Sequence, residues 1–295
     1  MRILHLTDTH LFAEPGTRHY DRIDTHLACQ GVLSHLDALS DVDLVVHSGD
    51  ASEDGSEASY EHLHALLDPF AQRLGAPLVV AMGNHDVSAA YARVRGAGDR
   101  GDHVQDCAVD LPGGGRVIVL DSSVPGAGYG DLGPEQLAWL QEVLREPAPA
   151  AADGTAVGSV LVVHHPPLPG ATELLAALEL GPMRELEEVL RGSDVRVILS
   201  GHYHHAMFGM RGEVPVHVAP GITNVVDVLG AGAHETALAL SGASLVELQP
   251  GAAPVVTSMT WPNTGDLPGQ TAAEPVYDLG LEQVRAIARA AGRPQ

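Results

Sequence analysis

Five apolar runs in the sequence are each followed at once by side chains that could bind a metal ion or move a proton. In chain order these side chains are Asp8, His10, Asp50, Asn84, His85, His164, His202 and His204. Carboxylate, amide and imidazole groups are common ligands of first-row metal ions. Each motif taken alone could be a polar turn or a helix N-cap, so the argument depends on their recurrence.

The spacing within the motifs allows neighbouring side chains to converge on one ion. His202 and His204 are two residues apart, as are Asp8 and His10. Gly49 lets the backbone turn closely before Asp50, whose two carboxylate oxygens could bridge two ions. His85 directly follows the neutral ligand candidate Asn84 and could carry out proton transfer.

The apolar runs are predicted to be buried strands, because they are rich in β-branched residues and end in turn residues. They cover residues 2–7, 43–47, 77–82, 159–163 and 195–199. Helices are predicted over 24–39, 56–74, 134–145 and 281–291, a loop and helix over 171–191, and a hairpin over 104–121. Further short strands are expected at 214–219, 221–228, 236–240, 243–248 and 254–260. In open α/β sheets, sites form beyond the carboxyl ends of strands, so the five exits should meet.

Composition limits the classes of partner. The chain of 295 residues has a formal net charge of −22 and contains no lysine, so a nucleic-acid polymer is not expected to bind. No apolar run is long enough to span a bilayer, and no secretory signal is visible. Cys29 and Cys107 show no disulfide or zinc spacing, which favours a reducing, cytoplasmic setting.

The set of candidate ligands indicates a dinuclear metal site. Oxygen and nitrogen donors without thiolate suit Fe, Mn or Zn better than a structural zinc site. Eight candidates are too many for one ion and about right for two, with one side chain left for proton transfer.

These motifs carry a family resemblance. D-T-H, G-D, G-N-H-D, H-H-P-P and G-H-Y-H, in this order over residues 1–228, resemble the motif set of the calcineurin-like metallophosphoesterases. Residues 8–11, 119–126 and 189–201 are most similar to the bacterial class III cyclic nucleotide phosphodiesterases, with the glycerophosphodiesterases close behind. The resemblance implies an α/β fold of two facing mixed β-sheets flanked by helices, a four-layer sandwich with the site at one rim.

The resemblance also implies how the ligands are divided. Asp8, His10, Asp50 and His204 would hold the first ion, while Asp50, Asn84, His164 and His202 would hold the second. His164 is preferred to His165 because the family spacing is H-x-P. Glu53 stands where this branch usually has aspartate, and neither it nor Asp86 is expected to bind an ion directly.

The implied function is hydrolysis of small phosphodiesters, most of all 3′,5′-cyclic nucleotides such as cAMP. Hydroxide activated by two divalent or trivalent transition-metal ions would attack phosphorus, with His85 as general acid. Asn84, His85 and His204 would contact the substrate. Without lysine, the ions, the histidines and Arg18 would balance the phosphate charge.

Several alternatives remain open at this point. A glycerophosphodiesterase or a broad-specificity phosphodiesterase or phosphatase would share the site. A protein phosphatase is possible on chemistry alone, and the net charge of −22 argues against a nuclease. A non-catalytic binding module would be expected to have lost ligands.

The chain is expected to comprise a catalytic domain at 1–260 and a C-terminal extension at 261–295. The helix at 281–291 is too short to be stable alone, so it must pack on something or fray. The extension could be a frayed tail, a cover over the metal cleft, or part of a homodimer contact.

Overall fold

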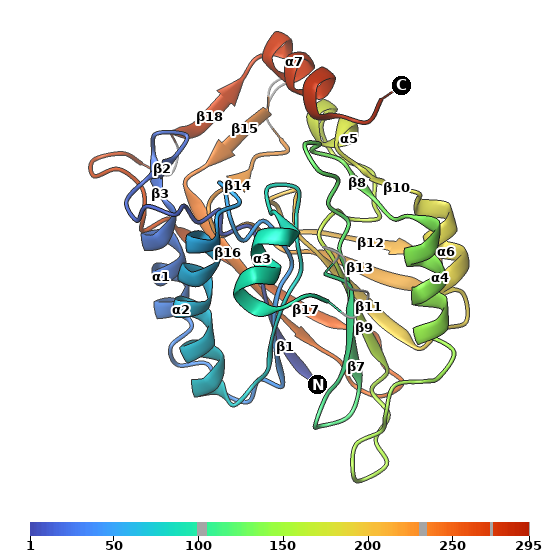
Figure 1. Ribbon diagram of the computed structural model, residues 1–295. Helices are drawn as coiled ribbons and strands as arrows, with labels where there is room; N and C mark the ends of the chain where they lie inside the picture. Colours follow the sequence, from blue (N-terminus) through green and yellow to red (C-terminus); the bar gives the residue numbers. More distant parts are fainter. Residues whose placement is uncertain (99–104, 230–234, 272–273, 295) are drawn as a thin grey trace.

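Two β-sheets face each other in the computed structural model, which describes residues 1–98, 105–229, 235–271 and 274–294 (Figure 1). The first sheet has the strand order β17 (Val255–Pro262), β16 (Leu240–Glu247), β1 (Arg2–Leu6), β4 (Leu44–His47) and β5 (Leu78–Val80). The second has the order β12 (Met207–Arg211), β13 (Val214–Val218), β11 (Val195–Ser200), β9 (Ser159–Val163), β7 (Arg116–Leu120) and β6 (Cys107–Asp110). Both sheets are mixed: the central strands β1, β4 and β5, and likewise β7, β9, β11 and β13, run parallel.

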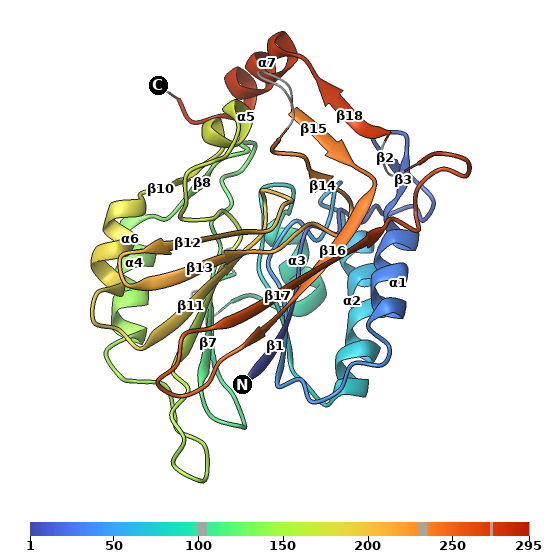
Figure 2. The same ribbon diagram turned by 180° about the vertical axis from the view of Figure 1, so that it is seen from behind.

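Alternation along the strands separates the hydrophobic core into layers. Ile3, Val46, Val119, Val162 and Leu199 fill the space between the sheets and are fully buried. The opposite face of the first sheet packs against α1 (Thr25–His35), α2 (Glu57–Leu74) and α3 (Ser88–Arg95). The outer face of the second packs against α4 (Pro134–Val143) and α6 (Met183–Leu190). Figure 2 shows the same layers from behind, and the four-layer sandwich implied by the resemblance is confirmed.

The predicted helices form where their end signals lie. Ser56 caps α2 by accepting a hydrogen bond from the Ser59 amide, and Gly75 ends the helix with a left-handed backbone. Asp24 caps α1 in the same way, but that helix ends at His35, four residues before the predicted end. The polar residues of the G-N-H-D motif do not cap the helix that follows, because α3 begins after Val87 without a side-chain cap.

Other departures from the sequence prediction have a tertiary cause. Strand β12 was not predicted, because it exists by pairing with β13 along the edge of the second sheet. Of residues 221–228, only β14 (Val225–Val226) is a strand. The amides of Ile222 and Thr223 instead donate to the carbonyls of Thr7 and Asp8, so this segment supports the end of β1. The predicted hairpin forms between β6 and β7, while residue 104 lies outside the described residues.

A smaller group of elements lies together at the top of Figure 1. It contains a three-stranded sheet of β14, β15 (Glu235–Leu238) and β18 (Pro275–Leu279), with two helices, α5 (Glu173–Ala177) and α7 (Leu281–Ala291). Two strand pairs of two residues each complete the fold, β2 (Arg18–His19) with β3 (Ile23–Asp24), and β8 (Gly130–Asp131) with β10 (Leu180–Gly181). Strand β18 was not predicted; it pairs with β15 and places part of the C-terminal extension in a sheet. Among the described residues, no helix has the length and apolar content of a membrane span.

Candidate dinuclear metal centre

Within each of the two sheets, the carboxyl ends of the neighbouring parallel strands lie together. The Asp8 amide donates to the Gly49 carbonyl at 3.0 Å, joining the segments that follow β1 and β4. The Gly201 amide donates to the His164 carbonyl at 3.0 Å, joining those that follow β11 and β9. The His202 amide donates to Asp8 Oδ1 at 3.1 Å, so candidate ligands 194 residues apart in the chain lie together.

The four side chains predicted to hold the first ion form one cluster. A ligand atom of each of Asp8, His10, Asp50 and His204 lies within 4.8 Å of the others. His10 Nε2 is 3.1 Å from His204 Nε2 and 3.7 Å from Asp50 Oδ2. His204 Nε2 is 3.3 Å from Asp8 Oδ1. Two carboxylates and two imidazoles at these separations can surround a single transition-metal ion.

The second predicted set adjoins the first through Asp50. His164 Nε2 lies 3.3 Å from Asp50 Oδ2, and the rings of His164 and His202 are 5.1 Å apart. His165 is also close to His202, but its two ring nitrogens already contact Ser122 Oγ at 2.8 Å and the Gly128 carbonyl at 3.3 Å. These contacts favour His164 over His165 as the ligand.

Buried polar atoms in the cluster lack hydrogen-bond partners among the described residues. They include Asp8 Oδ2, Asn84 Oδ1 and His164 Nε2. Leaving such atoms unpaired is costly, whereas cations bound by the two ligand sets would satisfy them. The residues present therefore fit a bound pair of metal ions.

The backbone is strained where the ligand candidates lie. Asp8, His10, Asp50, His202 and His204 all have positive φ, between 47° and 66°. Only eight non-glycine residues in the described part of the chain have positive φ, so these five make up most of them. Strain of this kind persists where the surrounding structure holds it, and it concentrates at functional sites.

Two glycines are needed because the site is tightly packed. A Cβ on Gly83 would collide with the carboxylate and amide of Asp50, and a Cβ on Gly201 would collide with the Thr7 hydroxyl. The glycines in G-N-H-D and G-H-Y-H therefore let the backbone approach the ligands closely.

Electrostatics favour the metal-binding protonation state at Asp8, Asp50 and His202, whereas for His164 the carboxylates of Asp50 and Asp8 outweigh burial and raise the pKa to about 9. Burial would raise the pKa of Asp8, but His204 outweighs it and holds the pKa below its ordinary value. Asp50 is likewise held well below its ordinary pKa, chiefly by His164 against the effect of burial. Burial, helped by the charge of His164, lowers the pKa of His202 to about 3, so this ring is neutral.

His85 faces the cluster and is held by acidic groups. Its amide donates to Asp50 Oδ1 at 2.9 Å, and its ring Nδ1 lies 3.1 Å from Glu53 Oε2. Burial lowers its pKa, but the carboxylates of Asp50 and Glu53 outweigh burial and raise the pKa to about 10. Glu53 also contacts His10 Nδ1 at 2.6 Å, so it orients both a ligand candidate and the candidate acid. These contacts give Glu53 a larger role than the sequence indicated.

Asp86 joins the loops rather than facing the cluster. Its carboxylate accepts hydrogen bonds from the amides of Gly83 at 2.8 Å, Ser52 at 3.0 Å and Ala51 at 3.2 Å. It thereby ties the segment after β5 to the segment after β4.

A cavity of about 120 Å³ lies over the cluster, which we call the metal cavity. Besides the ligand candidates and His85, it is lined by residues that the sequence argument did not select: His19, Tyr20, Leu174, Leu175, Leu178, Asn224, Val226, Glu235 and Tyr277. They come from short elements and from the C-terminal part of the chain. Arg18, expected to help balance phosphate charge, does not line the cavity; its guanidinium donates to the carbonyls of Arg22 and Gly265.

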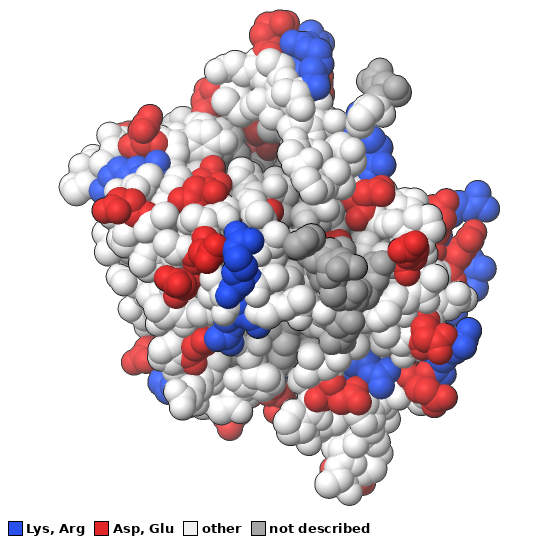
Figure 3. All heavy atoms as spheres, in the orientation of Figure 1, with Lys and Arg blue, Asp and Glu red and all other residues white. Residues whose placement is uncertain are grey.

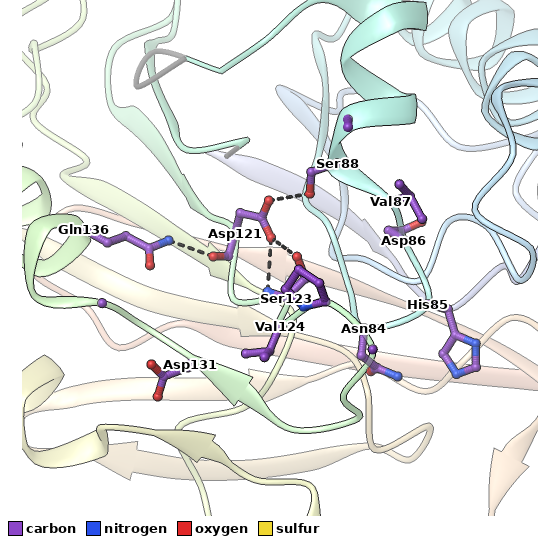
Figure 4. A pocket seen from close by; sticks show the side chains of 14 residues that line it. Asn84, His85, Asp86, Val87, Ser88, Asp121, Ser123, Val124, Asp131 and Gln136 are labelled. Carbon is purple, nitrogen blue, oxygen red and sulfur yellow. Dashed lines mark hydrogen bonds between the residues drawn. The ribbon is translucent and has the colours of Figure 1, made fainter. Parts of the chain in front are cut away.

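A second cavity of about 610 Å³ shares Asn84 and His85 with the metal cavity (Figure 4). In this view Asn84 and His85 lie at one side of the cavity, while Asp131 and Gln136 lie at the other. The Asp121 carboxylate accepts hydrogen bonds from Ser88 and Ser123, so it is already paired.

Comparison with known proteins agrees with this geometry. The model of the calcineurin-like phosphoesterase family matches residues 1–206. A probable cyclic nucleotide phosphodiesterase of Rhodococcus erythropolis is 40% identical over 74% of this chain and 69% of its own length. A cAMP/cGMP dual specificity phosphodiesterase of Mycobacterium tuberculosis is 36% identical over 84% of this chain and 76% of its own. The solved structure of GAP50 from Plasmodium has a similar fold, with a TM-score of 0.52 and 13% identity over 99% of this chain and 95% of that one.

Proposed function

Because the chain belongs to the calcineurin-like phosphoesterase family, and is therefore a metal-dependent phosphodiesterase, we propose that its substrates are 3′,5′-cyclic nucleotides such as cAMP. The observation that carries the metal-dependent chemistry is the cluster of buried, unpaired ligand atoms around Asp50, with His85 directly beside it. The names of the two bacterial relatives support the choice of a cyclic nucleotide.

Two bound ions, which we propose to be Fe, Mn or Zn, would supply an activated hydroxide and neutralise charge on the phosphate oxygens. Asp8, His10, Asp50 and His204 would hold one ion. Asp50, Asn84, His164 and His202 would hold the other. Neutral imidazole and ionised carboxylate are the forms that such ions require.

The protein side chains complete the reaction. Opening the cyclic diester leaves a negative charge on the departing ester oxygen, and the protonated His85 can donate a proton to it. Glu53 fixes the His85 ring through Nδ1, which leaves Nε2 as the nitrogen that would donate the proton. Asn84, His85 and His204 line the cavity, and we propose that they contact the phosphate oxygens.

Surface charge agrees with a small substrate. On the face shown in Figure 3, basic side chains are scattered among acidic ones and form no continuous basic surface among the described residues. A nucleic-acid polymer normally requires such a surface.

The test is a panel of four phosphate esters with the metal-loaded protein. A 3′,5′-cyclic nucleotide, a 2′,3′-cyclic nucleotide, a glycerophosphodiester and a phosphomonoester are compared by kcat/KM. We expect the 3′,5′-cyclic nucleotide to be the best substrate. A higher kcat/KM for the glycerophosphodiester or the phosphomonoester would overturn the proposed substrate class while leaving the metal chemistry in place.

A further inference from the structure

We propose that the ring of Tyr20, at the edge of the metal cavity, is the surface on which the base of the nucleotide stacks. This inference deepens the proposed function and rests on it only in taking the ligand to be a nucleotide. It concerns two tyrosines that line the metal cavity, Tyr20 and Tyr277, which we call the aromatic wall.

The aromatic wall lies within reach of a phosphate held by the ligand cluster, because both line the same cavity. The rings of Tyr20 and Tyr277 are 4.6 Å apart, and the ring of His19 packs against Tyr20 at 4.5 Å. Tyr20 is nevertheless 51% exposed. One part of its ring is therefore supported by neighbours while another part is exposed.

The backbone at Tyr20 is unfavourable for tyrosine. Its φ is +50°, in the left-handed region that glycine and asparagine occupy far more readily than a bulky aromatic residue. Asp21 beside it has a φ of +54°, so the turn between β2 and β3 holds two consecutive residues in this conformation.

The wall is held firmly by contacts between distant segments. The guanidinium of Arg22, in the turn that carries Tyr20, donates to both oxygens of Asp266 at 2.6 and 2.8 Å. It also donates to the carbonyls of Glu274 and Pro275, at the start of β18, which carries Tyr277. The two rings are thus positioned before a ligand arrives, which lowers the cost of binding.

The residues that line the metal cavity near the aromatic wall suit a flat, uncharged group. Among the described residues that line the metal cavity, none is arginine or lysine. Leu174, Leu175 and Leu178 add apolar surface to the lining. Any nucleobase can stack on an aromatic ring, because every base has a flat π-face. The polyol part of a glycerophosphodiester has no such face and would gain little from the two tyrosines.

The second cavity is a less suitable place for the base. None of the described residues that line it is Phe, Tyr or Trp, and it contains the acidic groups of Asp86, Asp121 and Asp131. It provides the competing location that an experiment must exclude.

Calorimetric titration of the metal-loaded protein with AMP and with ribose 5-phosphate isolates the contribution of the base, because the two probes share a phosphate and a ribose. We expect AMP to bind about 5- to 10-fold more tightly, the lower end of base–aromatic stacking because the ring is half exposed. Tyr20→Asn, which suits the left-handed backbone, should remove this difference. Tyr20→Phe should keep it.

A control variant in the second cavity is Val124→Phe, which fills space there and leaves the aromatic wall intact; it should keep the preference for AMP. Equal affinity of the wild-type protein for the two probes would overturn the inference. So would a preference that survives Tyr20→Asn but is lost in Val124→Phe, since the base would then lie in the second cavity. The proposed function is tested separately by hydrolysis of cAMP. A protein that binds AMP more tightly than ribose 5-phosphate but does not hydrolyse cAMP would overturn the proposed function and leave this inference in place.

Discussion

At the scale of single residues, the structure separates side chains that sit next to each other in the G-N-H-D motif. Asn84 has a buried amide oxygen without a partner among the described residues, while His85 is held by Asp50 and Glu53. Asp86 joins two loops through three backbone amides. Three adjacent polar residues therefore have three different expected roles: ligand, acid and loop tie.

Replacing His85 with alanine should slow the hydrolysis of substrates with poor leaving groups, such as cAMP, by about 10²–10⁴-fold. An activated aryl phosphodiester needs no proton on its leaving group, so its rate should change much less. Steady-state kinetics on both substrates measures the difference. Equal losses would mean that His85 is structural or binds an ion instead.

The pH dependence of the same reaction should have a basic limb. The ordinary pKa of histidine, 6.5, is raised to about 10 by Asp50 and Glu53, so the acid is protonated at neutral pH. Bound cations offset part of the charge on Asp50, so we expect kcat for cAMP to fall between these two values as the pH rises. Glu53→Gln removes one of the two carboxylates and should move the limb to lower pH. An unmoved limb would show that the Glu53 carboxylate does not raise the pKa of His85.

Asp50→Asn should weaken the whole metal centre, because Asp50 adjoins His10 and His164 and lies between the two ligand sets. Elemental analysis should find fewer ions per chain, and activity should fall with them. Glu57→Gln changes an exposed carboxylate on α2 and serves as the matched control. Full metal content in Asp50→Asn would show that Asp50 is not a metal ligand.

The sequence was sufficient to select the ligand candidates because they all follow strands, where local patterns are strongest. It could not select Tyr20, Glu235 or Tyr277. These residues reach the metal cavity from a two-residue strand pair and from the small third sheet, whose placement depends on long-range pairing rather than on local periodicity. The role of Glu53 was underestimated for the same reason, since contact with His10 and His85 cannot be read from spacing.

At the scale of elements, the C-terminal extension was predicted only in part: its helix follows from a local pattern, whereas its strand depends on long-range pairing. The helix predicted at 281–291 is α7, and it packs on α5 with Val284 only 2% exposed. Strand β18 was missed because its residues show no apolar alternation and begin with proline, so its pairing with β15 decides its conformation. Tyr277 on β18 lines the metal cavity, which supports the proposal that the extension covers the cleft.

Asp266→Asn should loosen the extension. The carboxylate is paired with Nε and Nη2 of the Arg22 guanidinium, and hydrogen bonds of this charged type contribute about 1.5–3 kcal/mol. Arg22 holds the pKa of Asp266 below its ordinary value of 3.8, so the contribution is complete above that pH and is lost as the pH falls through the folded-state pKa. Limited proteolysis at neutral pH should cut the variant faster after residue 262. Unchanged cleavage would show that the pair does not restrain this segment.

At the scale of the whole molecule, the four-layer arrangement places every candidate ligand at one end of two facing sheets. The resemblance implied this arrangement, and the hydrophobic alternation of the central strands accounts for it, since each strand has residues facing the other sheet and residues facing a helical layer. The third sheet and the α5–α7 pair were not foreseen as a unit. They lie together at the same end as the site and complete the walls of the metal cavity.

Metal loading should therefore stabilise the whole fold, because the ligands join segments from both sheets. An ion that binds the folded chain and not the unfolded one raises stability according to its concentration and affinity. Removing metals with a chelator should lower the melting temperature, and adding Mn²⁺ or Zn²⁺ back should restore it, with up to two ions per chain by elemental analysis. His35→Gln, which changes an exposed histidine stacked on Trp261 far from the cluster, should behave as the wild type. A reconstituted protein that never exceeds one ion per chain, or whose melting temperature is indifferent to the metal, would exclude a dinuclear centre built from both ligand sets.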